Sequence, residues 1–151
     1  MNERVFIGLG TNLGDRKANL EKVIKAIDKF AEVTNVSQLY DTAPYGYANQ
    51  GCFLNAAVEI KTGFHPEQLL KSLLGLETLM GRRRGIKNGP RIIDLDLLLY
   101  GDWCLETDIL TLPHPGIAER SFVLDPLCDL APDFIHPKLR YTLAELKERL
   151  R

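Results

Sequence analysis

Two aspartates, two residues apart, interrupt an apolar segment of the chain. Asp94 and Asp96 stand in IIDLDLLLY, residues 92–100, where the residue types predict a strand. Because side chains alternate along a strand, both carboxylates share one face. The opposite face is then expected to carry the apolar side chains of Ile93, Leu95, Leu97 and Leu99.

Two carboxylates at this spacing repel each other. They lie about 6.6 Å apart along the strand, and at an effective dielectric constant of about 20 the repulsion is about 2.5 kcal/mol. Hard oxygen ligands with room for water and phosphate suit Mg²⁺, so the pair is a candidate metal site. Two structural alternatives stay open, which are neutralisation by nearby arginines and a solvated sheet face.

The residues just before this strand are strongly basic. GRRRGIKNGPR, residues 81–91, places four arginines and a lysine among three glycines. A solvated charge run is the usual interpretation of such a segment. Its position directly before the diaspartate strand favours a phosphate-binding segment instead, because arginine binds phosphate through a planar fork. Arginines and Mg²⁺ around phosphate groups are typical of phosphoryl transfer.

A second group of residues has the chemistry to hold a planar heterocycle. Asn55, in the predicted strand FLNAAVEI at residues 53–60, offers a donor and an acceptor through its amide. Phe53 lies on the same face as Asn55, and with Phe122 it is able to sandwich a ring. The structural alternative, core phenylalanines and a hydrogen-bonded amide, stays open.

Two nucleotide-binding motifs are disfavoured. GLGTNLGD, residues 8–15, has the spacing GxGxxxG rather than GxGxxG, and the strand after it has no evident parallel partner. The chain contains no GxxxxGK[ST], which argues against a P-loop nucleotide hydrolase.

The elements that must position these residues follow from hydrophobic periodicity. Strands are predicted over residues 4–9, 33–40, 53–60 and 92–100. One helix is predicted over residues 16–30 after an Asp15 N-cap, and a second begins at Pro66 with Glu77 inside its apolar stripe. A proline interrupts the apolar segment SFVLDPLCDLAP, and Thr142 with Glu145 forms a capping box for the last helix.

This order predicts an α+β fold. A βαββαβ succession is typical of the ferredoxin-like sandwich, in which an antiparallel sheet carries both helices on one face. Here it is expected to carry a C-terminal helical extension, within a single domain spanning residues 1–151.

Composition limits the partners. With 19 basic and 20 acidic residues the net charge is −1, which disfavours nucleic acid as a partner. Three scattered cysteines without CxxC spacing fit a reducing cytoplasm, and the sequence shows no signal peptide and no membrane-spanning segment. His65 and His136 are interpreted as surface residues with no role.

Taken together, these motifs resemble the 6-hydroxymethyl-7,8-dihydropterin pyrophosphokinase family of the folate pathway. The resemblance rests on GTNLGD, YDTAPYG, FLNAAVEI, GRRRG…NGPRIIDLDLLLYG and LPHPGIAERSFVLDPLCDLAP, in family order from about residue 5 to residue 132. It implies transfer of the β,γ-diphosphate of ATP to the hydroxymethyl group of the dihydropterin, with release of AMP. The implied cofactor is a pair of Mg²⁺ ions, the implied fold is the ferredoxin-like sandwich, and we expect a cytoplasmic monomer.

The resemblance also implies roles for particular residues. Asp94 and Asp96 match the metal ligands, and Asp96 is further expected to orient the substrate hydroxyl or accept its proton. Arg82 and Arg91 match catalytic arginines that steady the transferring group. The implied ATP-binding set is Leu70, Glu77, Arg82, Arg84, Arg91, Thr111, His114 and Arg120. The implied pterin-binding set is Thr42, Pro44, Tyr45, Phe53, Asn55 and Phe122.

Three positions depart from the family pattern. Asn88 stands where an aromatic residue often precedes GPR, Ala43 where proline is frequent, and Ile109 where some members have arginine. None of them removes a metal ligand or a central arginine. Two other classes of function stay open, a non-catalytic ferredoxin-like module that binds a nucleotide or a partner, and an ATP hydrolase or ordinary kinase.

Overall fold

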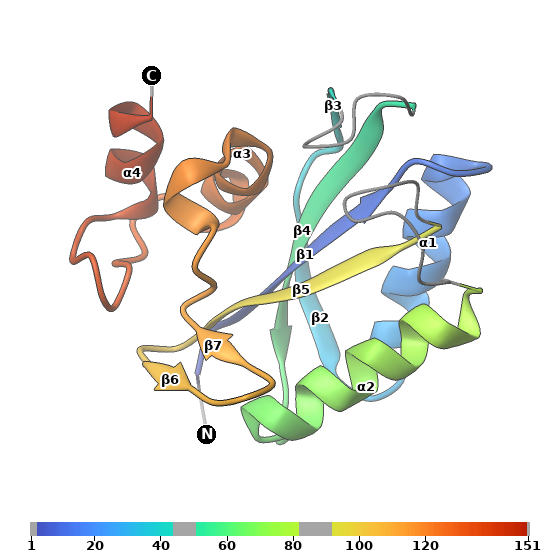
Figure 1. Cartoon of the computed structure of the whole chain (residues 1–151), viewed down its shortest axis with the longest axis horizontal. Helices are drawn as coiled ribbons and strands as arrows, with labels where there is room; N and C mark the ends of the chain where they lie inside the picture. The colour runs from blue at the N-terminus through green and yellow to red at the C-terminus, as the bar shows by residue number, and fades with distance from the viewer. Residues whose placement is uncertain (1–2, 44–50, 82–91, 151) are drawn as a thin grey trace.

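The computed structural model describes residues 3–43, 51–81 and 92–150. It is a mixed α/β structure built on one antiparallel sheet (Figure 1). The strands of this sheet are β1 (Val5–Thr11), β2 (Glu32–Val36), β3 (Tyr40–Thr42), β4 (Phe53–Lys61) and β5 (Asp94–Tyr100). The helices are α1 (Arg16–Ile27), α2 (Pro66–Leu79), α3 (Ser121–Leu130) and α4 (Leu143–Arg149), with the 3-10 helix η1 (Ile117–Glu119). A small hairpin joins β6 (Leu105–Glu106) to β7 (Thr111–Leu112).

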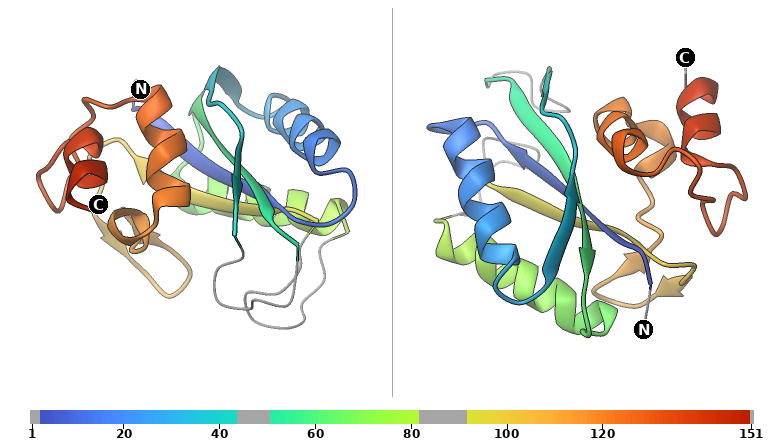
Figure 2. Two further views of the ribbon diagram at one scale, coloured as in Figure 1. Left: turned by 90° about the horizontal axis from the view of Figure 1, so that it is seen from above. Right: turned by 180° about the vertical axis from the view of Figure 1, so that it is seen from behind.

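The strand order is β2-β4-β1-β5, and every neighbouring pair is antiparallel. Strands β2 and β3 both pair with β4, β2 with residues 58–61 and β3 with residues 53–55. This topology, with α1 and α2 on one face, confirms the predicted ferredoxin-like fold (Figures 1 and 2). Both neighbours of β1 are antiparallel to it, which excludes a Rossmann unit at GLGTNLGD.

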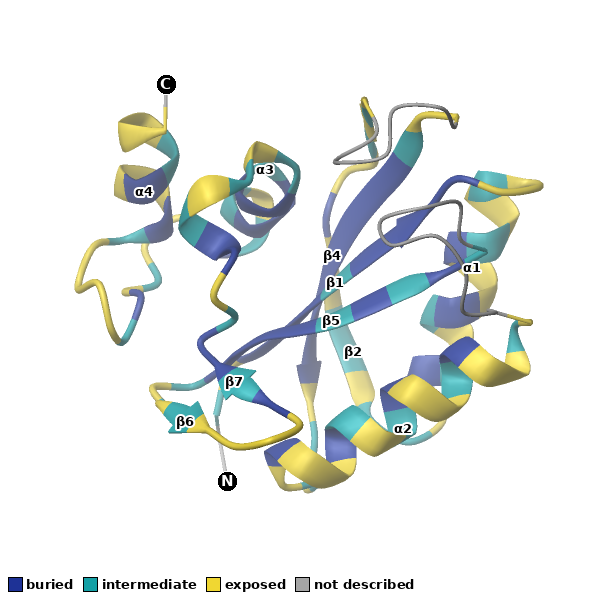
Figure 3. Cartoon of the chain, viewed as in Figure 1, coloured by how far each residue is buried: buried dark blue, intermediate teal, exposed yellow. Residues whose placement is uncertain are grey.

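Two apolar cores lie on the two faces of the sheet. The first is formed by α1 and α2 with the sheet residues Ile7, Leu9 and Val58. The second is formed by α3 and α4 with Phe6 of β1 and Leu98 of β5. Buried residues therefore run along both sides of β1, β4 and β5 (Figure 3).

The predicted second strand is wrong in its extent. Residues 33–40 do not form one strand, because β2 ends at Val36 and β3 begins at Tyr40. At the break, the Ser37 hydroxyl accepts the Ala57 N–H at 2.8 Å, so a side chain replaces a backbone partner. The following residues turn toward α3 before they pair with β4 again.

The predicted faces of β5 are wrong at one residue. Phe6 pairs with Leu99 and Ile7 pairs with Leu97, so Leu98 is an extra residue opposite β1. This bulge breaks the alternation. Leu99 therefore packs with Leu98 in the second core, while Leu95 and Leu97 stay in the first.

Helix boundaries mostly follow the predicted signals. Asp15 caps α1 by accepting the Ala18 N–H, and Thr142 and Glu145 form the expected capping box. The proline in SFVLDPLCDLAP does not break that segment, because α3 continues through Pro126. Burial of Leu124 and Leu127 against the sheet offsets the cost of a proline inside the helix. In the part of the chain that the structure describes, no helix has the length and apolarity needed to cross a membrane.

Candidate active site

The floor of the site is a glycine-lined section of the sheet. Across the adjacent strands β4, β1 and β5, Asn55, Gly10 and Asp94 are paired in one row, and Ala57, Gly8 and Asp96 in the next row on the same face. Two glycines in the middle strand leave the sheet without side chains between β4 and β5. A Cβ atom at Gly10 would lie 3.0 Å from Asn55 Oδ1, and one at Gly8 would lie 3.1 Å from Leu98 Cδ1.

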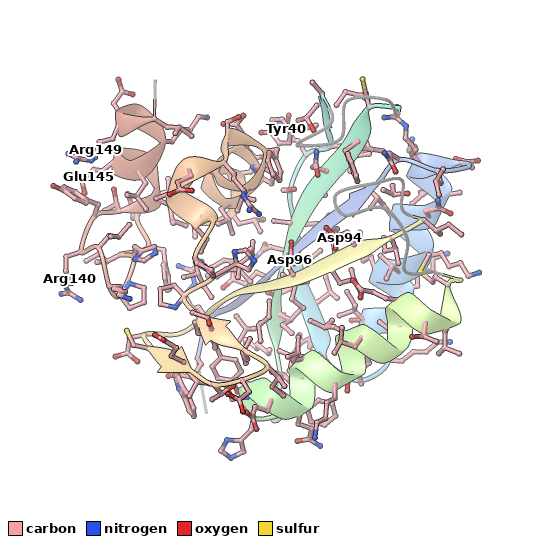
Figure 4. The ribbon with its side chains drawn as sticks, in the orientation of Figure 1. Tyr40, Asp94, Asp96, Arg140, Glu145 and Arg149 are labelled. Carbon is pink, nitrogen blue, oxygen red and sulfur yellow. The ribbon has the colours of Figure 1, made fainter. Side chains whose placement is uncertain are left out.

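A pocket opens above this floor, between the sheet and the start of α3. Seven of the predicted site residues line this pocket, and they come from β3, β4, β5, α3 and the N-cap residue of α3. They are Thr42, Phe53, Asn55, Asp94, Asp96, Arg120 and Phe122. Figure 4 shows Asp94 and Asp96 next to each other along β5, on the side that faces α3. The two carboxylates therefore share a pocket with the two phenylalanine rings.

The amide of Asn55 is held from the neighbouring strand. Its Nδ2 donates to Thr42 Oγ1 at 2.6 Å, and the residue is buried. Strand β3 supplies this partner because Thr42 pairs with Phe53 and Tyr40 pairs with Asn55. The bond orients the amide within the pocket.

His114 lies next to the diaspartate pair. Its Nε2 is 4.0 Å from Asp96 Oδ1, too far for a direct hydrogen bond, and its Nδ1 accepts the Gly116 N–H at 3.1 Å. Burial lowers the pKa of His114, and the charge of Arg120 lowers it further, whereas Asp94 raises it. The imidazole is therefore neutral near pH 7, with its proton on Nε2 facing Asp96.

Arg120 is fixed by local sequence at the entrance to α3. It is the residue immediately before the helix, and its guanidinium carbon is 5.9 Å from the centre of the Phe122 ring. The guanidinium packs so closely on Gly116 that a Cβ there would lie 2.8 Å from Arg120 Cζ. The glycine in PHPGIAER therefore leaves the space that the guanidinium occupies.

The other described residues of the predicted ATP-binding set do not line this pocket. Glu77 is buried inside α2, where its Oε2 accepts the Leu95 N–H of the edge strand β5 at 2.8 Å. Leu70 packs against the first core. Thr111 and His114 line a second cavity of about 480 Å³, between the β6–β7 hairpin and residues 136–139.

Several predicted site residues cannot be placed. Pro44, Tyr45, Arg82, Arg84 and Arg91 lie outside the described residues, as does Asn88. Of the three departures from the family pattern, Ala43 lines the pocket beside Thr42, and Ile109 is exposed in the loop between β6 and β7.

Some residues in and near the site were not predicted from their residue types. Gly8 and Gly10 form the floor, but the sequence predicts no site role for them, only the end of a strand and a disfavoured dinucleotide-binding motif. Gly8 lies in the predicted strand 4–9, whereas Gly10 lies just beyond its predicted end. Because β1 extends to Thr11, the two glycines at i and i+2 share a face of the strand. His136 was also misjudged as a surface residue, because it is buried and its Nδ1 accepts the backbone N–H groups of Lys138 and Leu139.

The fold and the site together define a class of protein. A ferredoxin-like sheet that places two carboxylates beside a pocket lined by aromatic rings and an amide fits an enzyme acting on phosphates and a heterocycle. The chain belongs to the 7,8-dihydro-6-hydroxymethylpterin-pyrophosphokinase family, whose model matches residues 6–132. This membership confirms the predicted family and a transferase of the pyrophosphokinase type.

Individual relatives agree with this assignment. The chain is 40% identical to the 2-amino-4-hydroxy-6-hydroxymethyldihydropteridine pyrophosphokinase of Aquifex aeolicus, over 95% of this chain and 89% of the relative. It is 44% identical to the enzyme of the same name from Bacillus subtilis, over 86% of this chain and 79% of the relative. A crystal structure of Plasmodium falciparum HPPK-DHPS matches 99% of this chain with a TM-score of 0.81 and 18% identity. This chain covers 45% of that longer one, so the match supports the fold alone.

Proposed function

We propose that this chain transfers the β,γ-diphosphate of ATP to the hydroxymethyl oxygen of 6-hydroxymethyl-7,8-dihydropterin, releasing AMP, in the pocket between β4, β5 and α3. The observation that carries the proposal is the shared pocket of Asp94, Asp96, Phe53, Asn55 and Phe122. The proposed metal ligands and the proposed ring-binding residues thus line one concave surface.

The pterin is proposed to bind in the slot made by Phe53, Asn55 and Phe122. The faces of the phenylalanine rings suit a flat bicyclic ring, and the Asn55 amide, oriented by Thr42, matches a heterocycle edge that both donates and accepts. Pro44 and Tyr45 complete this set in our proposal, on the strength of their sequence positions.

Asp94 and Asp96 are proposed to hold two Mg²⁺ ions. The two side chains are half-exposed on one strand face, so water and phosphate oxygens have access to them. In the described ranges 3–43, 51–81 and 92–150, no group of three or more His, Cys, Asp or Glu residues is arranged to bind a metal. A site with two protein carboxylates fits Mg²⁺, which keeps several waters and binds with substrate phosphates. When bound, the ions supply neutralisation of the charge on the phosphate oxygens.

Binding and charge are proposed to supply most of the catalysis. The hydroxymethyl oxygen attacks the β-phosphorus, the bond from that phosphorus to the α-phosphate oxygen breaks, and AMP leaves. A loose transition state needs little help from a strong base, so in-line positioning and neutralisation dominate. Asp96 orients the hydroxyl or accepts its proton.

The basic residues are proposed to bind the nucleotide. Arg120 at the pocket rim and the neutral His114 beside Asp96 contact the phosphates. Arg82 and Arg91 steady the transferring group and Arg84 binds a phosphate, as their sequence positions indicate. Thr111 and Leu70 contribute on the adenosine side, and Glu77 acts there through its bond to the edge strand.

We further propose a single domain over residues 1–151 that acts as a cytoplasmic monomer, without nucleic acid or a membrane surface. The two cores share one sheet, which supports the single domain. The near-neutral net charge supports the proposal that nucleic acid is not a partner, and the three free cysteines support the cytoplasmic location.

One assay tests the reaction. The protein is incubated with Mg-ATP, with and without 6-hydroxymethyl-7,8-dihydropterin, and the nucleotides are separated by chromatography. AMP that forms only in the presence of pterin is the expected result. ADP would point to a kinase or hydrolase, and no turnover would favour a non-catalytic binding module; either result contradicts the proposal.

A further inference from the structure

An acidic residue occupies an electrostatically unfavourable position on α3. Asp129 lies in the last turn of the helix, where the helix dipole disfavours negative charge, and Asp125 stands one turn before it. Asp129 is also exposed, so burial does not hold it there. A specific partner is the remaining reason for a carboxylate at this end of the helix.

The partner is the short strand β3. The hydroxyl of Tyr40 lies 2.8 and 2.9 Å from the two carboxylate oxygens of Asp129, and the Gln38 N–H donates to Oδ2 at 3.1 Å. Figure 4 shows the Tyr40 side chain extending from β3 on the side of α3. Burial and the hydrogen bond to Asp129 raise the pKa of Tyr40 to about 12, so the phenol stays protonated and keeps donating at neutral pH.

This contact joins the two walls of the pocket. On β3, Tyr40 pairs with Asn55, and two residues later Thr42 pairs with Phe53 and accepts the Asn55 amide. On α3, Phe122 and Asp129 are seven residues apart, which places them on one face of the helix, two turns from each other. The helix face that carries one wall of the ring slot is therefore fastened to the strand that orients the other wall.

Strand β3 has a second polar contact, on its opposite side. Arg16 of α1 donates to Asp41 Oδ1 at 2.6 Å and to the Cys52 carbonyl at 3.0 Å. Asp41 follows Tyr40 directly, so the two side chains leave the strand on opposite faces. The Asp41 contact joins β3 to the α1 layer, whereas the Tyr40 contact spans the pocket side.

We propose that Tyr40 and Asp129 form a clasp that sets the distance between the Phe53 and Phe122 walls, which makes both of them positioning residues for the pterin. Neither residue lines the pocket, so each acts through the walls that it fastens. The inference rests on the proposed binding of the pterin between those walls.

Four single variants of the full chain test the clasp. Tyr40→Phe removes the donor, Asp129→Ala removes the acceptor, and Asp129→Asn keeps one acceptor oxygen. Tyr141→Phe is the matched control, since it removes the hydroxyl of an exposed tyrosine that lies between α3 and α4, outside the pocket. Steady-state kinetics are measured for pterin and for ATP separately, together with pterin binding by fluorescence and thermal unfolding.

We expect Tyr40→Phe and Asp129→Ala each to raise the pterin KM and Kd about fivefold, which lies within the range typical for the loss of one intramolecular hydrogen bond. The ATP KM and kcat are expected to stay within about twofold of wild type, and Asp129→Asn is expected to recover most of the pterin affinity. The double variant Tyr40→Phe/Asp129→Ala should lose no more affinity than Asp129→Ala alone, because the contact that Tyr40→Phe breaks is already lost when Asp129 is removed.

The outcomes separate the clasp from the function on which it rests. If the wild-type protein fails to bind pterin, the proposed function is wrong. If wild type binds and the clasp variants bind equally well, or lose pterin and ATP affinity in parallel with thermal stability, the contact is structural and the clasp is overturned. A Tyr141→Phe variant with the same pterin defect would also overturn it.

Discussion

The two faces of one sheet are built on different rules. On the face toward α1 and α2, β1 presents Val5, Ile7 and Leu9, and these side chains are buried in an apolar core. On the face toward α3, the same strand presents Gly8 and Gly10, which form the floor of a pocket. Strand β5 repeats the contrast, with Leu95 and Leu97 on the first face and Asp94 and Asp96 on the second.

This difference shows how one strand serves both stability and chemistry. Alternation allows every second residue to be chosen for packing and the residues between them for the site. The face covered by α1 and α2 holds the strands in place, and the pocket region of the α3 face then carries polar groups that would be costly inside a closed core. Changes on the two faces should therefore be separable, the first affecting stability and the second affecting turnover.

The largest effect is expected at the carboxylates. Asp94→Ala should reduce Mg²⁺-dependent turnover by about 10²–10³-fold or more, since this is the usual cost of losing a charge-stabilising group. Thermal stability should change little, because Asp94 is half-exposed. Turnover is measured by pterin-dependent AMP release over a range of Mg²⁺ concentrations, with the exposed Asp102→Ala as control. Retained turnover in Asp94→Ala would contradict the metal assignment.

A matched change on the opposite face should have the reverse profile. Leu69 of α2 is fully buried, so Leu69→Ala should lower the free energy of unfolding by about 2–5 kcal/mol through lost burial and a cavity. At a temperature where the variant is folded, its pterin and ATP KM values should match wild type. Urea denaturation and steady-state kinetics measure the two quantities. A selective loss of pterin affinity without loss of stability would show that the two faces are not separable.

A smaller effect is expected at the floor of the pocket. In Gly10→Ala the new methyl group would lie 3.0 Å from Asn55 Oδ1 and 3.6 Å from a Phe53 ring carbon. We expect the pterin Kd to rise about tenfold, a difference of about 1.4 kcal/mol, because the methyl group displaces the amide and fills the slot. Isothermal titration calorimetry with the pterin measures it, and Gly63→Ala is the control, because a Cβ at that glycine meets no atom within 4 Å. Unchanged pterin affinity would show that the glycine floor is incidental.

Alternation explains how much of this site was predictable. Period-two patterning was sufficient to place Asp94 with Asp96 and Phe53 with Asn55, and the order of elements was sufficient for the sheet. The sequence shows Glu77 inside an apolar stripe, but one of its partners is a backbone N–H of β5, which side-chain patterns do not reveal.

The remaining errors share a physical cause, because each depends on a partner distant in the chain. The bulge at Leu98 is defined by the pairing of β1 with β5, and the break at Ser37 by its bond to Ala57. Helix α3 tolerates Pro126 because it packs on the sheet. Residues 44–50 and 82–91 lie outside the described structure, so the prediction for their arginines and aromatic residues rests on sequence.

The smallest expected effect is a difference in acid sensitivity between the layer on the α3 face and the α1–α2 layer. His136, between α3 and α4, is buried, and its Nδ1 accepts two backbone N–H groups. Burial lowers its pKa, the local backbone hydrogen bond raises it, and the charge of Lys138 lowers it further, with a net decrease. Folding therefore favours the neutral form. The stabilisation is fully present above the unfolded-state pKa of about 6.5 and is lost as pH falls through the lowered folded-state value.

We expect acidification from pH 7 to pH 5 to lower the hydrogen-exchange protection factors, which are corrected for the intrinsic exchange rate at each pH, in residues 134–142 and α4 before those of α1 and α2. His136→Asn is the matched variant, because its carbonyl oxygen is able to accept the same two N–H groups without titrating. In that variant the acid-dependent loss of protection should be absent, whereas it should persist in the exposed His65→Asn. Equal acid sensitivity in α2 and α4 would show that the two layers lose protection as one unit. An undiminished response in His136→Asn would show that another group controls the α3–α4 layer.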